Sequence, residues 1–467
     1  MRISWSVFIL LFAVIYTVNG EENKTTEAPK TTAVPKHPAV KTLQSALCKK
    51  CKCDKYKLLL DCSRLQLTEW FKTDEIDTLV YGNIKFETID LSFNNLTKVP
   101  AFPKLSVKNV LLNFNKIEEI ANAAFQNLTH LTKLDLSNNQ LNNSKLVPEI
   151  FEGNYSPSEY EPLEFLRELN LANNDLHKLR EDIFEHCDNL EFLDLSYMQL
   201  SKLPGEILHG SGNLETVVLT GNLFKLIPDE ALSNTVKLKS LNMDENPIDE
   251  VGGDNVFPKL EKLEYLSLSY MNDLKTIGVG AFKNLPNLKT LQVTHNPALT
   301  TFSVEAFASY DKKNSSIVTY PTLENLYLDG NNLKKLDEKI LNKWESIQQI
   351  SLSNNPWDCD DHNTWFISNL VPYIHNSLSV PMARNIKCAS PTEMRDKEVY
   401  EIHVQNREAE LQQGGGGGSV VLGIFIGIIV GVPMTFGILL ILRKYRNNSS
   451  SSTVNYNRAK FESNFDI

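Results

Sequence analysis

The sequence predicts an α/β repeat solenoid: a curved stack of coils with a parallel sheet on its concave face, cysteine-containing caps at both ends and one transmembrane helix. Three observations lead to this prediction. The pattern L-x-x-L-x-L-x-x-N-x-L recurs eleven times. Four of the seven cysteines lie between Cys48 and Cys62. Residues 420–442 form an uncharged apolar run of 23 residues.

The repeats extend over residues 86–357, from "FETIDLSFNNL" to "IQQISLSNNPW". The second leucine position of each L-x-L falls at residues 91, 112, 136, 171, 195, 219, 243, 268, 293, 328 and 352. Most intervals are 24 or 25 residues and two are 35. The long intervals predict insertions at residues 143–162 and 311–320.

Each part of the repeat has a physical role. L-x-L predicts a short strand whose alternate residues face inward. The asparagine after it turns the chain, and its amide can bond backbone groups that would otherwise be buried unpaired. The return along the convex side carries a predicted spine of packed rings, Phe125, Phe184, Phe282 and Phe307. One coil cannot bury its own leucines, whereas stacked and capped coils can.

"NLTHLTKLDLSNNQL" resembles the 24-residue repeat of the extracellular leucine-rich repeat family of animal receptors and adhesion proteins. The resemblance covers roughly Cys48 to Ile402 and implies a horseshoe fold. The resemblance is to Toll-ectodomain-like and connectin-like single-pass membrane proteins of animals, and it implies an arthropod origin. It implies a binding function in innate recognition or cell contact.

"CKKCKCDKYKLLLDC" resembles the family's N-terminal cysteine cap, predicted over residues 48–85. Sequence alone leaves three pairings of these four cysteines open. The resemblance implies Cys48–Cys53 and Cys51–Cys62. A C-terminal cap is predicted over residues 358–404. Because Asp361 stands where the family commonly has a cysteine, one bridge, Cys359–Cys388, is expected there.

The flanking segments predict a plasma-membrane protein that crosses the membrane once with its N-terminus outside. Residues 1–20 match a signal peptide, and residues 21–47 a Thr/Pro-rich disordered arm. Residues 405–419 are expected to be a Gly-rich flexible linker. The run 420–442 is long enough to span a bilayer, and Arg443, Lys444 and Arg446 after it place the short tail, 443–467, in the cytoplasm. A buried core helix is the disfavoured alternative.

Composition and motifs favour a binding protein over other classes. A net charge of −10 argues against nucleic acid. No catalytic, cofactor or metal motif stands out, and "DCDDH" at 358–362 is interpreted as solvated cap residues. Cys187 is interpreted as a small buried hydrophobe, the alternative being a reactive thiol.

The concave face is the predicted contact surface for an extracellular protein or glycoconjugate. N-glycosylation sequons are present at Asn23, Asn95, Asn127, Asn142, Asn154 and Asn314, and the central coils hold none. Exposed aromatics mixed with acids are typical of protein-binding faces, although they could merely cover the strands. The candidate ligand-binding residues of these coils are Phe192, Asp194, Tyr197, Asp244, Glu245, Tyr265, Tyr270 and His295. Phe93 and Phe114 occupy similar places in the first two repeats.

Two further motifs concern association at the membrane. Gly423, Gly427 and Gly431 recur every four residues, which suits a homodimer of close-packed membrane helices or reflects ordinary glycine content. The C-terminal Phe465 and Ile467 suit a PDZ-type cytoplasmic partner. The predicted role is an adhesion or recognition co-receptor; a structural protein organising extracellular matrix or a specialised membrane is the alternative.

Two repeats break the asparagine rhythm. "LDLSYMQL" and "LSLSYMNDL" place Met198 and Met271 where the other nine repeats have asparagine. A thioether cannot donate to the turn, so a local loss of hydrogen bonds and a softer sheet are expected. Met198→Asn and Met271→Asn should then raise stability. Tolerated drift in a long array is the plainer interpretation.

Overall fold

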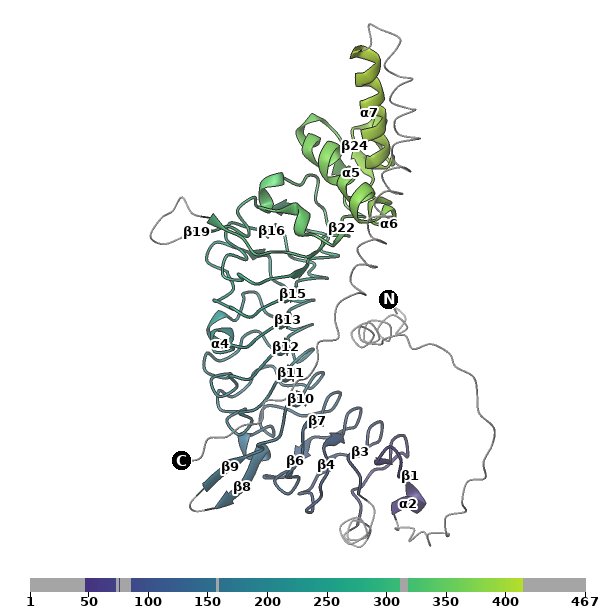
Figure 1. Cartoon of the computed structure of the whole chain (residues 1–467). Coiled ribbons are helices and arrows are strands. Elements are labelled where there is room, and N and C mark those ends of the chain that lie inside the picture. Colours follow the sequence, from purple (N-terminus) through teal and green to yellow (C-terminus); the bar gives the residue numbers. More distant parts are fainter. Residues whose placement is uncertain (1–46, 73–74, 76–84, 157–158, 311–317, 415–467) are drawn as a thin grey trace, which may run out of the picture. The chain divides into compact units, whose positions relative to one another are not determined.

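The computed structural model describes residues 47–72, 75, 85–156, 159–310 and 318–414. Its main element is a 13-stranded sheet to which each coil contributes one short strand (Figure 1). Eleven of these strands are the L-x-L segments and pair in parallel, which confirms the predicted solenoid. In order they are β3 (Thr88–Asp90), β5 (Asn109–Leu111), β7 (Lys133–Asp135), β10 (Glu168–Asn170), β11 (Phe192–Asp194), β12 (Thr216–Val218), β13 (Ser240–Asn242), β15 (Tyr265–Ser267), β17 (Thr290–Gln292), β21 (Asn325–Tyr327) and β22 (Gln349–Ser351).

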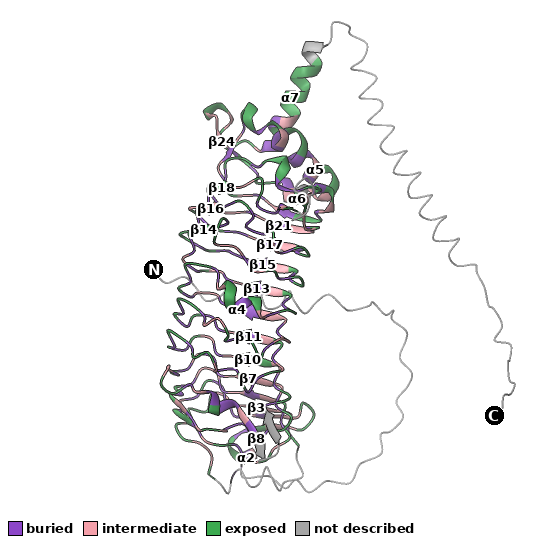
Figure 2. Cartoon of the chain, turned by 90° about the vertical axis from the view of Figure 1, so that its left-hand side faces the viewer, coloured by how far each residue is buried: buried purple, intermediate pink, exposed green. Residues whose placement is uncertain are grey.

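The register places like positions of successive coils beside one another. Leu193 in the middle of β11 pairs with Leu169 on one side and Val217 on the other. The middle residue of each L-x-L strand is buried, and its two neighbours are mostly half-buried (Figure 2). The coils therefore share one continuous core, and the flanking side chains line the surface of the sheet.

The return segments carry short strands and packed rings. β4 (Lys98–Val99) pairs with β6 (Glu119–Ile120), and β14 (Glu250–Val251), β16 (Thr276–Ile277) and β18 (Thr301–Phe302) form a second parallel sheet. One return contains the helix α4 (Asp229–Ser233). The rings predicted to form a spine, Phe125, Phe184, Phe282 and Phe307, are all buried, and those of Phe282 and Phe307 are 5.0 Å apart.

The regular spacing of asparagines corresponds to a row of buried amides. Asn222 is typical: its Nδ2 donates to the carbonyls of Leu195 (2.8 Å) and Leu219 (2.9 Å). Its Oδ1 accepts from the backbone N–H groups of Met198 (3.1 Å) and Leu200 (3.0 Å). Each amide thus joins two coils and pairs backbone groups inside the stack.

At the two breaks in the rhythm, the core takes up the methionine side chains. Met198 and Met271 are both 0% exposed. The coil before Met198 rearranges: Leu176 N donates to Asn174 O (3.0 Å), and His177, at φ +44°, donates its N–H to Met198 O (3.0 Å). Apolar packing therefore replaces the amide at these positions.

Both predicted insertions form antiparallel hairpins. β8 (Glu152–Ser156) and β9 (Glu159–Pro162) follow the short helix η1 (Pro148–Phe151). β19 (Ser309–Tyr310) pairs with β20 (Val318–Thr319). The extra residues of the two long intervals therefore leave the sheet register undisturbed.

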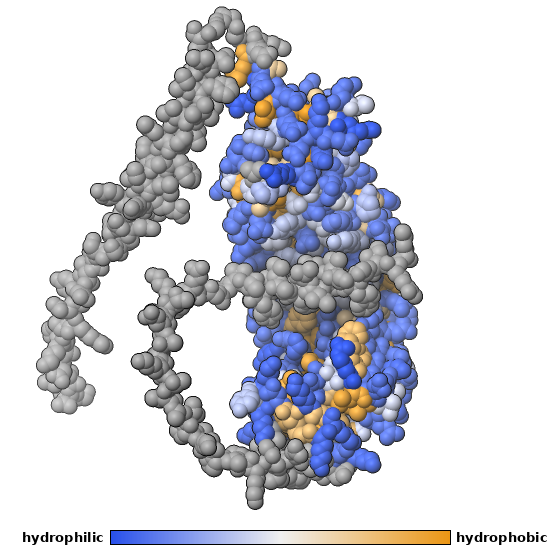
Figure 3. All heavy atoms as spheres, turned by 90° about the vertical axis from the view of Figure 1, so that its right-hand side faces the viewer, coloured by the Kyte–Doolittle hydropathy of each residue, from blue (hydrophilic) through white to orange (hydrophobic). Residues whose placement is uncertain are grey.

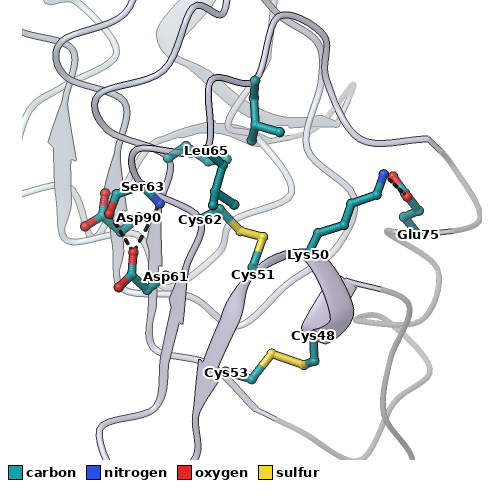
Figure 4. The surroundings of a disulfide bond; sticks show 12 residues. Cys48, Lys50, Cys51, Cys53, Asp61, Cys62, Ser63, Leu65, Glu75 and Asp90 are labelled. Carbon is teal, nitrogen blue, oxygen red and sulfur yellow. Dashed lines mark hydrogen bonds and ion pairs between the residues drawn. A yellow bond between two sulfur atoms is a disulfide. The ribbon is translucent and has the colours of Figure 1, made fainter.

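The N-terminal cap closes one end of the core. It consists of α2 (Leu47–Lys50) and the antiparallel pair β1 (Lys52–Asp54) and β2 (Leu59–Asp61), with β2 leading into the parallel sheet. Disulfides join Cys48 to Cys53 and Cys51 to Cys62, the pairing that the resemblance implied (Figure 4). Lys50 forms an ion pair with Glu75 beside them.

The C-terminal cap closes the other end with short helices. The last coil contains η2 (Glu338–Ile340) and η3 (Trp344–Ser346), and β23 (Trp357–Asp358) then pairs with β24 (Cys388–Ser390). The disulfide Cys359–Cys388 ties this pair together. Between and after these strands lie η4 (Asp361–Asn363), η5 (Phe366–Leu370), α5 (Val371–Tyr373), η6 (Ile374–Leu378), α6 (Val380–Ala383), η7 (Thr392–Met394) and α7 (Val399–Gly414).

The structure corrects one predicted boundary. The flexible linker was expected from Gln405, but α7 is helical as far as Gly414. Residues 407–413 are Arg, Glu, Ala, Leu and Gln, all good helix formers, so the helix continues through them as far as Gly414.

Several predictions lie outside the described residues. In the described ranges, no helix is long and apolar enough to cross a membrane. The run 420–442, the signal peptide, residues 21–46 of the arm and the tail are not described. The same holds for Asn23, Asn314, the side chain of Asn154, Gly423, Gly427, Gly431, Phe465 and Ile467.

Candidate functional site

A column of left-handed residues follows the strands. In every repeat, the third residue after the strand has a positive φ, between +54° and +72°. The turn needs this conformation to bring the next residue, asparagine or methionine, back into the core. We call this column the left-handed ladder: Phe93, Phe114, Asn138, Asn173, Tyr197, Gly221, Glu245, Tyr270, His295, Gly330 and Asn354.

Apart from Glu245, the residue types on the left-handed ladder fall into two groups. Five positions hold asparagine or glycine, which tolerate this conformation. Five others hold rings, Phe93, Phe114, Tyr197, Tyr270 and His295. A non-glycine residue in this region costs roughly 1–3 kcal/mol, and such strain is concentrated at functional sites. The rings at these positions therefore stand in a backbone conformation that costs folding free energy locally.

At the N-terminal end, the rings stack on one another. Phe93 and Phe114 lie parallel, 7° apart, with centroids 4.4 Å apart. The guanidinium of Arg64 lies 3.9 Å from the centroid of Phe93, in a cation–π contact. Figure 3 shows the right-hand side of Figure 1, where hydrophobic residues gather toward the lower, N-terminal coils.

In the centre, Tyr197 spans three coils. A Cβ at Gly221 would collide with Cδ1 and Cε1 of the Tyr197 ring, so the glycine leaves room for it. Beyond Gly221, the Tyr197 hydroxyl donates to Glu245 Oε1 at 2.8 Å. Burial and the hydrogen bond to Glu245 raise the pKa of Tyr197, and the nearby Asp244 and Asp194 add to this.

Further along, Tyr270 and His295 repeat the arrangement. Their rings are stacked 4.8 Å apart, at 9°. A Cβ at Gly330 would lie 3.0 Å from His295 Cδ2, so this glycine also leaves room for a ring. Tyr270 is 50% exposed and Tyr197 38%, so both rings remain accessible.

Two predicted acids lie beside the left-handed ladder and are partly buried. Asp194 Oδ1 accepts from the backbone N–H of Ser196 (2.9 Å), and Asp244 Oδ1 accepts from Ser267 Oγ (2.6 Å) and the Ser269 N–H (2.7 Å). Burial raises the pKa of both carboxyls.

The remaining predicted residues lie on the strands. Tyr265 begins β15, and its hydroxyl donates to Gln292 Oε1 at 3.0 Å. Phe192 begins β11, at the other end of that strand from Asp194. The structure thus brings Tyr197, Glu245, Asp244 and Asp194 together and pairs Tyr270 with His295. Phe192 lies apart from these groups.

Sequence reasoning placed the tyrosines on the surface but missed the left-handed ladder. Tyrosine and phenylalanine are not residues that predict a positive φ. The signal lies in the column: the same repeat position holds glycine at Gly221 and Gly330 and asparagine at Asn138, Asn173 and Asn354. A repeat position that holds glycine or asparagine in some coils and an aromatic ring in others indicates a turn whose left-handed conformation is fixed by the fold.

The side chains of three sequon asparagines are described, and none of the three lies in the central coils. Asn95 is half-buried and follows Asn94, the buried asparagine of its repeat. The Nδ2 of Asn127 donates to Phe102 O at 2.9 Å. Asn142 Oδ1 accepts from Ser144 Oγ of its own sequon at 2.7 Å. Cys187 is fully buried, and burial raises the pKa of its thiol, as expected of a core cysteine.

Comparison with known proteins identifies the family. Residues 165–224, 212–274 and 261–312 match the family model "Leucine rich repeat", and residues 130–154 match a second model of that description. Lumican of Rattus norvegicus is 31% identical over 279 residues, which are 56% of this chain and 76% of lumican. The chain belongs to the leucine-rich repeat family.

Other leucine-rich repeat proteins are more distant or only partly covered. Tsukushi of Gallus gallus is 28% identical over 278 residues, 59% of this chain and 62% of Tsukushi, so the match spans less than two thirds of that relative. A solved octameric complex of latrophilin 3, Unc5D and FLRT2 contains a leucine-rich repeat chain with 19% identity and a TM-score of 0.47, covering 75% of this chain and 95% of that one. An arthropod origin and the likeness to Toll-type and connectin-type proteins stay predictions.

Proposed function

We propose that this leucine-rich repeat protein acts at the cell surface and binds an extracellular protein or glycoconjugate through its left-handed ladder and the adjoining strands. Its role is adhesion or recognition as a co-receptor. One observation supports the proposal most: rings stand at left-handed positions, and glycines on neighbouring coils leave room for two of them. Exposed, rigid aromatic side chains are typical anchors of protein interfaces.

The proposal includes a membrane anchor. Residues 420–442 would span the plasma membrane, with the solenoid outside and residues 443–467 inside. Gly423, Gly427 and Gly431 would allow two such helices to pack as a homodimer. Phe465 and Ile467 would bind a cytoplasmic PDZ-type partner. Each of these rests on the sequence alone.

A structural role in extracellular matrix or a specialised membrane is the second candidate. The extent of the solenoid favours it, because long regular sheets also suit scaffolding. A scaffold would tolerate changes on the exposed rings, whereas a recognition protein would not. The two functions therefore differ in what Tyr197 and Tyr270 contribute.

The test is binding of partner cells by cells that display the full chain. Tyr197→Ser combined with Tyr270→Ser should reduce binding of cells from the source tissue, or clustering with cells that display the same chain, by about tenfold or more. Tyr56→Ser is the matched control, because Tyr56 is fully exposed on the N-terminal cap, away from the ladder. Unchanged binding by the double variant at equal surface expression would contradict recognition through this face and favour the structural role.

A further inference from the structure

The C-terminal ends of the central and later strands are acidic. The six-residue segments 192–197, 216–221, 240–245, 265–270, 290–295, 325–330 and 349–354 each run from a strand to its ladder residue. These segments contain Asp194, Asp244, Glu245 and Asp329 but no lysine or arginine. The protein surface along this margin of the sheet therefore carries negative charge without basic residues of its own to neutralise it.

The opposite margin of the same strands carries bases as well as acids. Residues just before the strands β10 to β17 form ion pairs between coils: Arg167 with Glu191 (3.3 Å), Lys239 with Glu215 (2.6 Å) and Lys289 with Glu264 (3.0 Å). Three acids of this margin are therefore each paired with a base, whereas Glu324, just before β21, adds one further acid. The two margins differ although both border the same sheet, so the negative charge at the strand ends is local rather than a consequence of the net charge.

Aromatic faces adjoin the acids. Tyr197 hydrogen-bonds Glu245, and Asp244 lies on the same coil as Glu245 with Asp194 on the coil of Tyr197. The Tyr197 ring is partly exposed and fixed over Gly221. A ring face together with carboxylates favours a guanidinium or ammonium group, which gains a cation–π contact and an ion pair at once.

We propose that this surface, Asp194, Tyr197, Asp244 and Glu245, receives a basic segment of a partner protein, with an arginine or lysine side chain placed against the Tyr197 ring and the Glu245 carboxylate. Charge complementarity selects this occupant over an acidic glycan, which the same carboxylates would repel. Asp194 and Asp244 are held by hydrogen bonds from their own and the next coil, so the acids are positioned before a partner binds. The inference rests on the proposed function and names the chemistry of its partner.

The test uses the full chain in detergent micelles and two fluorescent peptides. One peptide has two arginines flanked by glycine and serine; its twin carries citrulline, which has nearly the same shape without the charge. The arginine peptide should bind about tenfold tighter, and this preference should shrink as salt is added. Asp244→Asn with Glu245→Gln should abolish the preference. These changes keep the acceptor oxygens of both side chains, and unchanged thermal melting would show that the fold is intact.

Asp254→Asn is the matched control, because it removes one charge from an exposed turn after β14, outside the main sheet, and should leave the preference unchanged. Equal binding of the two peptides, or a preference that survives the double change, would overturn the inference. So would self-association of the chain through these residues in place of peptide binding. If cell binding is lost in the tyrosine variant while the peptides bind equally, the inference fails and the proposed function stands.

Discussion

Two requirements meet at Gly221, and both exclude a side chain. Its φ is +67°, and a Cβ there would collide with the ring of Tyr197. We expect Gly221→Ala to lower the free energy of unfolding by more than the roughly 1–2 kcal/mol that the backbone conformation alone costs, because the Tyr197 ring must also move. Chemical denaturation measures the change, and exposure of Tyr197 should rise in the same variant.

Gly212→Ala is the control for this substitution. Gly212 lacks a positive φ, and a Cβ there would meet nothing within 4 Å. Its replacement should leave stability nearly unchanged. Equal effects at the two glycines would show that Tyr197 does not occupy the space above Gly221.

At Met198 the structure changes the prediction made from the pattern. An asparagine would regain hydrogen bonds worth about 0.5–1.5 kcal/mol each. It would lose the burial of a methionine, worth about 1.5–3 kcal/mol. Because Met198 is fully buried, the two terms nearly offset and the expected gain in stability disappears.

We therefore expect the free energy of unfolding of Met198→Asn to lie within about 1 kcal/mol of the wild-type value. Met198→Ala gains no hydrogen bond, so its free energy of unfolding should be about 2–5 kcal/mol lower. Urea titrations of both variants measure this difference. A loss as large in Met198→Asn as in Met198→Ala would mean that the coil cannot return to the amide arrangement.

Among the elements, the strands and their asparagine turns could be predicted from sequence because the strand recurs in all eleven repeats and the asparagine in nine of them, each with one physical role. The spacing of Leu193 and Leu195 gives the strand, and that of Asn222 gives the turn. Helix α7 could not be placed because the glycine run beyond it dominated the composition of the segment. The contacts of Tyr197 with Gly221 and Glu245 could not be predicted from the sequence either, because they join three coils that only the strand register brings together.

The stability of the fold depends on pH through two carboxyls near the ends of β11 and β13. Burial raises the pKa of Asp194 and Asp244 above the ordinary value of 3.8. A raised pKa in the folded state means that the folded chain binds protons more readily than the unfolded chain. The stability contribution of these groups is therefore greatest below 3.8, falls as pH rises through the raised pKa, and stays low above it.

The double variant Asp194→Asn with Asp244→Asn cannot lose stability by this titration, and each amide keeps an oxygen that accepts hydrogen bonds. The double variant should match the wild type below pH 3.8 and be more stable at neutral pH. Unfolding free energies at the two pH values test this. A difference between variant and wild type that does not change with pH would show that the two carboxyls do not titrate differently on folding.

In the whole molecule, the sequons and the central part of the left-handed ladder, from Tyr197 to His295, occupy different stretches of the chain. The sequon asparagines Asn95, Asn127 and Asn142 belong to the first coils, and Asn314 lies in the second insertion. Tyr197, Glu245, Tyr270 and His295 lie in between. A glycan attached to the central sheet would cover the proposed contact surface, so its absence there is what a binding face requires.

One substitution can reverse this arrangement. Gln292 ends β17 and is followed by Val293 and Thr294, so Gln292→Asn creates a sequon in the centre of the sheet. The glycan should block partner-cell binding while the protein still reaches the cell surface. Adding Thr294→Ala to Gln292→Asn removes the sequon and should restore binding. Val236→Thr creates a sequon at Asn234 just after α4, away from the sheet, and should leave binding intact. Full binding by the glycosylated Gln292→Asn protein would place the contact surface elsewhere on the solenoid.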